Sequence, residues 1–145
     1  MFARIEASTE RGSVVLVDTS VWIEVFRRPA RVTLEQAVDL DDVLTCLPVI
    51  QEVLQGFRDE SAFQKAHRAM LSLPLVESPV GADTFLQAVH LYRAGRRAGL
   101  TIRSGVDCLI AACAIRHEVE LLHHDRDYDS IAKISALRVR RVRLH

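Results

Sequence analysis

Short apolar runs alternate with longer stretches of mixed polarity along the chain. The runs predict strands at 14–17, 43–47, 73–77, 120–125 and 137–144. Apolar residues at helical spacing predict helices at 20–28, 33–42, 49–57, 60–71, 83–97, 106–117 and 128–135. Strands that alternate with helices in this order indicate an α/β protein, a three-layer α/β/α sandwich around a mainly parallel sheet.

The first apolar run ends abruptly in Asp18, Thr19 and Ser20. A run of this length with three β-branched residues predicts a strand buried on both faces, as in a parallel sheet. An aspartate after such a strand lies at the carboxyl edge of the sheet, where ligands bind in open α/β folds. Aspartate is also a good helix N-cap, so Asp18 alone is compatible with a purely structural role.

Three further carboxylates are predicted at the same edge. Glu52 begins the helix after the second strand, Asp107 lies in the first turn of the helix before the fourth strand, and Asp125 ends that strand. Each has an ordinary alternative as a helix cap, a first-turn acid or an exposed helix residue. Four such placements together favour a site for a hard cation, Mg²⁺ or Mn²⁺, and metal-dependent hydrolysis of phosphodiesters.

Other polar residues near these acids are candidates for supporting roles. Asp127 and Ser20 could assist the metal ligands or cap helices, and His123 could do so or simply be hydrogen-bonded. Arginines close to Asp107 in sequence are the candidates for binding substrate phosphates: Arg96, Arg97 and Arg103.

Composition narrows the class of protein. The 19 Lys and Arg balance the 19 Asp and Glu, which argues against strong non-specific binding of nucleic acid. The three cysteines have no C-x-x-C spacing, so we expect reduced thiols. No apolar run reaches membrane-spanning length and no signal pattern opens the chain, so we expect one cytoplasmic domain, 1–145, with a frayed lead-in at 1–13.

The run Val-Asp-Thr-Ser-Val-Trp-Ile at 17–23 resembles the opening of PIN-domain nucleases, especially VapC-like toxins of toxin–antitoxin pairs. Segments 47–56, 106–114 and 121–131 match that family in order and spacing. The resemblance implies a five-stranded parallel sheet of order 3-2-1-4-5 and an acidic site for one or two Mg²⁺ or Mn²⁺ ions. It also implies endoribonuclease activity on RNA such as tRNA, a homodimer, and inhibition by a cognate antitoxin.

The family's four acids fall on Asp18, Glu52, Asp107 and Asp125. Asp127 matches a frequent additional acid, and Ser20 matches a hydroxyl often found beside the metal. The chain departs from the family at two positions. His123 stands where threonine is common, and Tyr128 stands where phenylalanine is usual.

Two other functions compete with this interpretation. A catalytically silent scaffold that binds RNA or protein would not need four mutually repelling carboxylates. A phosphatase of the aspartyl-phosphate kind would need a second aspartate at the position of Ser20 and a suitably placed lysine. The only lysines, Lys65 and Lys133, are not so placed.

Overall fold

The computed structural model describes residues 13–145, so almost all of the expected lead-in lies outside the described residues. Within them, a four-stranded parallel sheet has the order β2-β1-β3-β4. The strands are β1 (Val15–Val17), β2 (Val43–Leu44), β3 (Glu120–His123) and β4 (Val139–Arg141). The predicted α/β class and the parallel sheet are confirmed.

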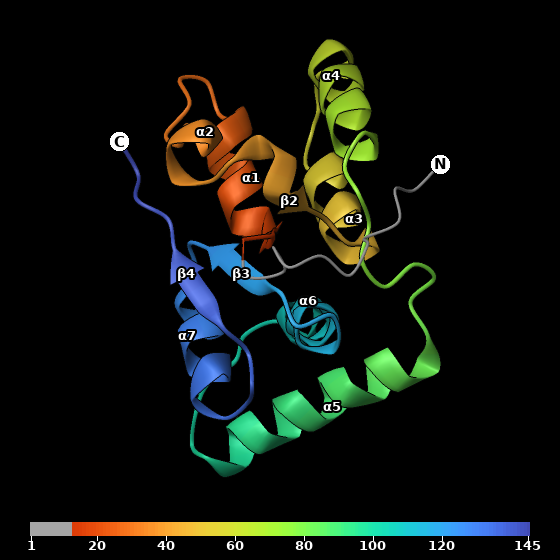
Figure 1. Ribbon diagram of the computed structural model, residues 1–145, viewed down its shortest axis with the longest axis vertical. Coiled ribbons are helices and arrows are strands. Elements are labelled where there is room, and N and C mark those ends of the chain that lie inside the picture. Colours follow the sequence, from red (N-terminus) through yellow and green to blue (C-terminus); the bar gives the residue numbers. More distant parts are fainter. Residues whose placement is uncertain (1–12) are drawn as a thin grey trace.

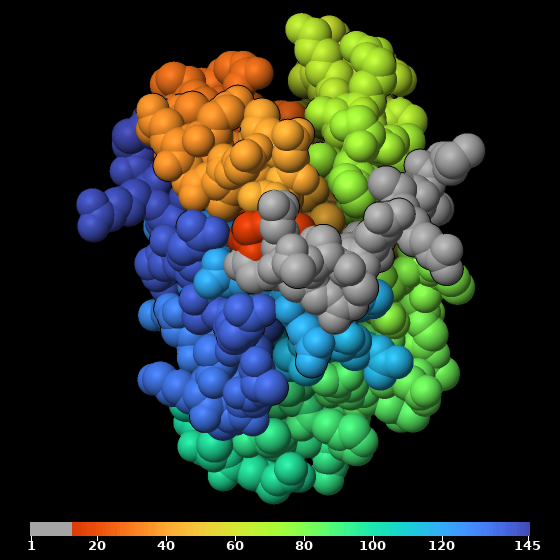
Figure 2. Space-filling model, viewed as in Figure 1, coloured from red at the N-terminus to blue at the C-terminus, as the bar shows by residue number. Residues whose placement is uncertain are grey.

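Helices cover both sides of the sheet. They are α1 (Thr19–Phe26), α2 (Leu34–Ala37), the 3₁₀ helix η1 (Leu40–Asp42), α3 (Leu47–Gln55), α4 (Glu60–Leu71), α5 (Ala82–Arg97), α6 (Gly105–Arg116) and α7 (Arg126–Lys133). Figure 1 shows α1 to α4 on one side of the strands, and α6 on the other side with α5 outermost. The same long α5 forms the lower rim of the surface in Figure 2.

The expected strand at 73–77 is reduced to a single parallel bridge between Thr45 and Leu75. The Thr45 N–H donates to the Pro74 carbonyl at 3.0 Å, and the Val76 N–H donates to the Thr45 carbonyl at 3.0 Å. Pro74 has no N–H for a ladder, and the backbone turns left-handed at Glu77, with φ 54°. The predicted order therefore holds, but the prediction of five full strands is wrong.

The predicted helix at 33–42 is also wrong in its length. It divides into α2 and η1, with an extended residue, Val38, ending the first. The side chain of Asp39 accepts a hydrogen bond from the Asp41 N–H and so begins a new turn. Thr33 precedes α2 but its side chain does not cap the helix; the Thr33 hydroxyl pairs instead with Nε2 of His145 at 3.0 Å.

Strand β4 is shorter than the predicted 137–144 and lies at the edge of the sheet. By contrast α6 is buried almost all round, and it packs against α5, α7 and β3 in the core. Within 13–145, no helix combines the length and the apolar character needed to cross a membrane.

The face of α5 that packs against α6 is only partly buried. Ala88 lies in the core, whereas Phe85 and Val89 are 53% and 50% exposed. They border a groove of about 600 Å³ between α5 and α6, which Arg103 also lines. The helical spacing was correct, but the sequence did not indicate how little of this face α6 covers.

Candidate active site

Asp18 lies where β1 ends and α1 begins. Its backbone N–H donates to the Leu122 carbonyl at 2.9 Å, which fixes it beside the end of β3. As the N-cap of α1, its Oδ2 accepts from the Ser20 N–H at 2.9 Å and from the Ser20 hydroxyl at 2.6 Å. The Ser20 oxygen in turn accepts from the His124 N–H at 2.9 Å. Ser20 therefore connects the loops that follow β1 and β3.

Asp107 enters the same site from the first turn of α6. Ser104 caps this helix by accepting from the Val106 N–H. The Asp107 side chain is only 9% exposed. The hydroxyl of Tyr128 lies between the two acids, 2.6 Å from Oδ1 of Asp18 and 3.3 Å from Oδ1 of Asp107. A residue of α7 thus joins acids contributed by β1 and α6.

Asp125 and Asp127 complete the cluster. Asp125 caps α7 by accepting from the Asp127 N–H at 2.9 Å. Asp127 is 2% exposed. One carboxylate oxygen from each of Asp107, Asp125 and Asp127 lies within 4.8 Å of the other two. Asp127, which was expected only in a supporting role, therefore lies as close to the centre of the cluster as Asp107 and Asp125.

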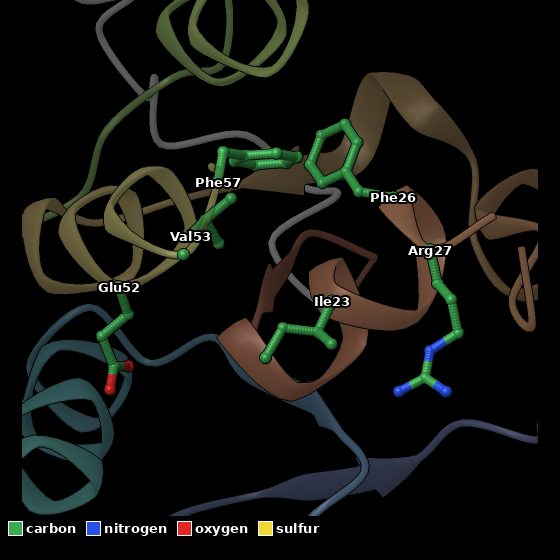
Figure 3. Close-up of a pocket in the computed structure, with 7 residues that line it drawn as sticks. Ile23, Phe26, Arg27, Glu52, Val53 and Phe57 are labelled. Atoms are coloured by element: carbon green, nitrogen blue, oxygen red, sulfur yellow. The ribbon is translucent and has the colours of Figure 1, made fainter. Parts of the chain in front are cut away.

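Glu52 approaches from α3 and is half-buried. Its Oε1 accepts from the Thr19 hydroxyl at 2.8 Å, which ties it to α1. In Figure 3 its carboxylate points from α3 toward the ribbon of α6, away from the rings of Phe26 and Phe57. Those rings and Ile23 line a pocket of about 380 Å³ that Glu52 borders. An apolar pocket therefore adjoins the acidic cluster.

Asp107 and Glu52 have raised pKa values. The pKa of Asp107 rises to about 7, chiefly because the side chain is buried and then because Asp18 and Asp125 repel its negative charge. Burial also raises the pKa of Glu52, with a smaller contribution from Asp18. A cation would offset both effects. The donors are carboxylate oxygens with a neighbouring serine hydroxyl, a set that fits Mg²⁺ or Mn²⁺ rather than a thiophilic metal.

His123 lies beside the cluster, and its ring contacts Tyr128 and Asp125. Its Nδ1 accepts from the Asp125 N–H at 3.2 Å, and its ring centroid is 5.5 Å from that of Tyr128. Burial lowers its pKa. The ring is completely buried, whereas His124 is partly exposed, as expected for neighbours on a strand. His123 therefore supports the backbone of Asp125 and the ring of Tyr128.

The three candidate arginines have different surroundings. Arg103 binds the cluster directly, with Nη2 2.9 Å from Oδ1 of Asp125 and Nε 3.2 Å from Oδ2 of Asp127. Arg96 instead covers the ring of Tyr92, 5.1 Å from its centroid. Arg97 is exposed at the end of α5. The contacts of Arg103 with the acids and the bridging hydroxyl of Tyr128 have no signal in the sequence, where Arg103 is a candidate only for binding phosphate.

Comparisons with known proteins agree with this geometry. The PIN domain family matches residues 15–134. Ribonuclease VapC11 of Mycobacterium tuberculosis is 39% identical over 132 residues, which cover 86% of this chain and 96% of the relative. Ribonuclease VapC18 of the same species is 30% identical over 125 residues, 84% of this chain and 90% of the relative.

Solved structures share the fold at lower identity. VapBC2 from Rickettsia felis, bound to a DNA fragment from its promoter, superposes with a TM-score of 0.72 at 17% identity, covering 89% of this chain and 98% of that chain. VapC20 of Mycobacterium tuberculosis, described as a toxin that cleaves the sarcin–ricin loop, gives 0.64 at 21% identity over 86% and 98%.

Proposed function

The chain belongs to the PIN domain family and, within it, to the VapC ribonucleases, and from this premise we propose that it is a metal-dependent endoribonuclease that acts as the toxin of a toxin–antitoxin pair. The observation that carries the proposal is the convergence of carboxylates at one sheet edge. Acids from four separate elements meet there, and the burial of Asp107 makes its charge costly without a cation.

We assign Asp18, Glu52, Asp107 and Asp125 as the catalytic acids and metal ligands. Asp127 lies within ligand distance of Asp107 and Asp125 and supports the same position. Mg²⁺ or Mn²⁺, as one or two ions, is the cofactor that this donor set favours. Bound there, it would supply Lewis-acid stabilisation of the charge that develops on phosphate oxygens.

The chain's own residues position this chemistry. The caps and the Tyr128 hydroxyl hold the carboxylates before substrate arrives, so little reorganisation is needed. Arg103, already at the site, is the best placed of the arginines to contact a phosphate, and Arg96 and Arg97 lie on the preceding helix. The apolar pocket beside Glu52 offers the rings of Phe26 and Phe57 to an unpaired base.

We propose an RNA substrate with structured character, such as tRNA, and a cognate antitoxin as the physiological inhibitor. An antitoxin segment that enters the acidic site and presents an arginine would satisfy the carboxylates. If Asp18→Asn and Glu52→Gln left antitoxin affinity unchanged at every salt concentration, this mode of inhibition would be wrong. A homodimer in the cytoplasm completes the proposal.

Cleavage of total RNA by the purified protein tests the enzyme. We expect discrete fragments with Mg²⁺ or Mn²⁺, no fragments with a chelator, and a loss of at least about 100-fold in Asp18→Asn and Asp107→Asn. Asp83→Asn, an exposed acid of the α5 first turn, is the control and should retain full activity. Cleavage that survived both substitutions would contradict the proposal, and a folded protein that bound RNA without cutting it would favour the scaffold.

A further inference from the structure

Arg103 makes several direct hydrogen bonds to carboxylates of the acidic cluster. It immediately precedes Ser104, the N-cap of the helix that carries Asp107. Its backbone N–H donates to Oδ2 of Asp127 at 3.0 Å, and its Nε reaches both oxygens of the same carboxylate, at 3.3 and 3.2 Å. Three donor contacts from one residue therefore occupy Asp127.

The same guanidinium also contacts a residue that we assign as a metal ligand. Its Nη2 donates to Oδ1 of Asp125 at 2.9 Å, an oxygen that also accepts from the Asp127 N–H. Asp125 and Asp127 belong to the trio whose oxygens lie within 4.8 Å of one another. The positively charged guanidinium of Arg103 is thus bound to two of the three carboxylates that would bind a cation.

The opposite side of Arg103 is open. Its side chain is 54% exposed, and it borders the groove between α5 and α6. Within residues 13–145, its hydrogen bonds run through the backbone N–H, Nε and Nη2, and its Nη1 makes none. The guanidinium can therefore leave Asp125 by rotating into solvent, while its backbone N–H keeps its contact with Asp127.

We propose that Arg103 is a positioning residue that acts as an internal counter-ion of the site: it holds Asp125 and Asp127 together before a divalent cation binds, and it competes with that cation for Asp125. This inference rests on the proposed function, because it takes Asp125 as a metal ligand. The guanidinium of Arg103 and a bound cation would repel each other at Asp125, so Arg103 weakens cation binding. At the same time its hydrogen bonds maintain the geometry of the site.

The test is the dissociation constant of Mn²⁺, measured by electron paramagnetic resonance of the free ion. Arg103→Gln should bind Mn²⁺ roughly tenfold more tightly than the parent protein, because a nearby positive charge is gone. A merely structural role predicts weaker binding instead. Arg140→Gln is the matched control: its guanidinium is 45% exposed and binds Glu120 at the start of β3, and its Mn²⁺ affinity should equal that of the parent.

Arg103→Gln removes the guanidinium from the buried Asp127 and leaves it the backbone N–H of residue 103, which could destabilise the fold. A second comparison therefore keeps the inference testable if this variant does not fold. Asp127→Asn and the double variant Asp127→Asn/Arg103→Gln carry no charge at position 127. The double variant should bind Mn²⁺ about tenfold more tightly than Asp127→Asn. Equal or weaker binding in either comparison would overturn the inference. A parent protein that neither binds Mn²⁺ nor cleaves RNA would instead contradict the proposed function.

Discussion

The hydroxyl of Tyr128 donates a 2.6 Å hydrogen bond to Oδ1 of Asp18, although the two residues lie 110 positions apart. Tyr128 is completely buried. Burial, followed by the negative charges of Asp18 and Asp107, raises its pKa well above the usual value, so the hydroxyl stays protonated and remains a donor. The buried hydroxyl of Tyr128 therefore stabilises the ionised carboxylate of Asp18 by a hydrogen bond.

Tyr128→Phe should destabilise the metal-free protein by about 1.5–3 kcal/mol, because a buried carboxylate loses a donor. Urea denaturation in the presence of a chelator measures this change. Tyr92→Phe is the control, since the Tyr92 hydroxyl makes no hydrogen bond within residues 13–145 and its ring lies beneath Arg96. Equal stability of Tyr128→Phe and the parent would show that the 2.6 Å contact contributes nothing.

Asp107→Asn should abolish cleavage and yet stabilise the metal-free protein at pH 8 by about 1–3 kcal/mol. The folded pKa of Asp107 is about 7, above its unfolded value. Its contribution to stability is therefore fully present below about pH 4 and is lost as the pH rises through 7. The difference in Tm between variant and parent, measured with chelator from pH 4 to 8, should grow with pH. A constant difference would contradict the electrostatic cause.

Glu77 provides a pH dependence of opposite sign, in a network that contains Thr84, Arg116 and His117. Burial by itself would raise the pKa of Glu77. Hydrogen bonds with Thr84 and His117 and the charge of Arg116 together lower it by more, so the net shift is downward. Its stabilisation is thus present above the unfolded pKa of about 4.5 and is lost as the pH falls through the folded pKa.

Glu77→Gln should therefore cost about 1–2 kcal/mol at pH 7 and progressively less below pH 4.5. Chemical denaturation at pH 7 and pH 3.5 measures the two values. The exposed Glu35 of α2 offers a control, since Glu35→Gln should change stability by less than about 0.5 kcal/mol at either pH. A cost for Glu77→Gln that did not depend on pH would indicate lost packing rather than lost charge.

The caps at Asp18 and Asp125 predict that the choice of substitution matters. Alanine at either position removes a side-chain acceptor from a helix start, which costs about 1 kcal/mol. Asparagine keeps an acceptor and should remain closer to the parent in stability, while both variants lose cleavage. Thermal unfolding of the four variants separates the two effects. Asparagine variants as unstable as the alanine variants would show that charge, rather than capping, stabilises these helix ends.

The sequence predicted the edge of the sheet where Asp18, Asp107 and Asp125 meet. Asp18 and Asp125 each follow a buried strand and begin a helix, and Asp107 lies in the first turn of a helix that Ser104 caps. Such junctions depend on local signals, namely an apolar run followed by a capping residue. The contacts of Arg103 and Tyr128 could not be predicted in this way. They depend on the orientation of α7 relative to α6 and on single side-chain conformations, neither of which has a periodic signature.

Local competition explains the errors in the fold. Pro74 and the left-handed backbone at Glu77 limit the expected strand to one bridge, although its apolar pattern is correct. Asp39 divides the expected helix at 33–42, and Thr33 bonds to His145, 112 residues away, instead of capping. In each case a side-chain or backbone preference outweighs the apolar periodicity.

Asp18 and Asp125 are both helix N-caps and proposed metal ligands. This affects how a related protein that has lost its nuclease activity can be recognised from its sequence. Because both aspartates begin helices, a descendant that no longer cuts RNA would still gain from keeping them. Glu52 and Asp107 cap no helix, and burial raises the pKa of each, so their ionised forms are disfavoured in the metal-free fold. In a relative that has lost activity, we expect Glu52 and Asp107 to be substituted before Asp18 and Asp125. The presence of Glu52 and Asp107 is therefore the more telling mark of a working enzyme.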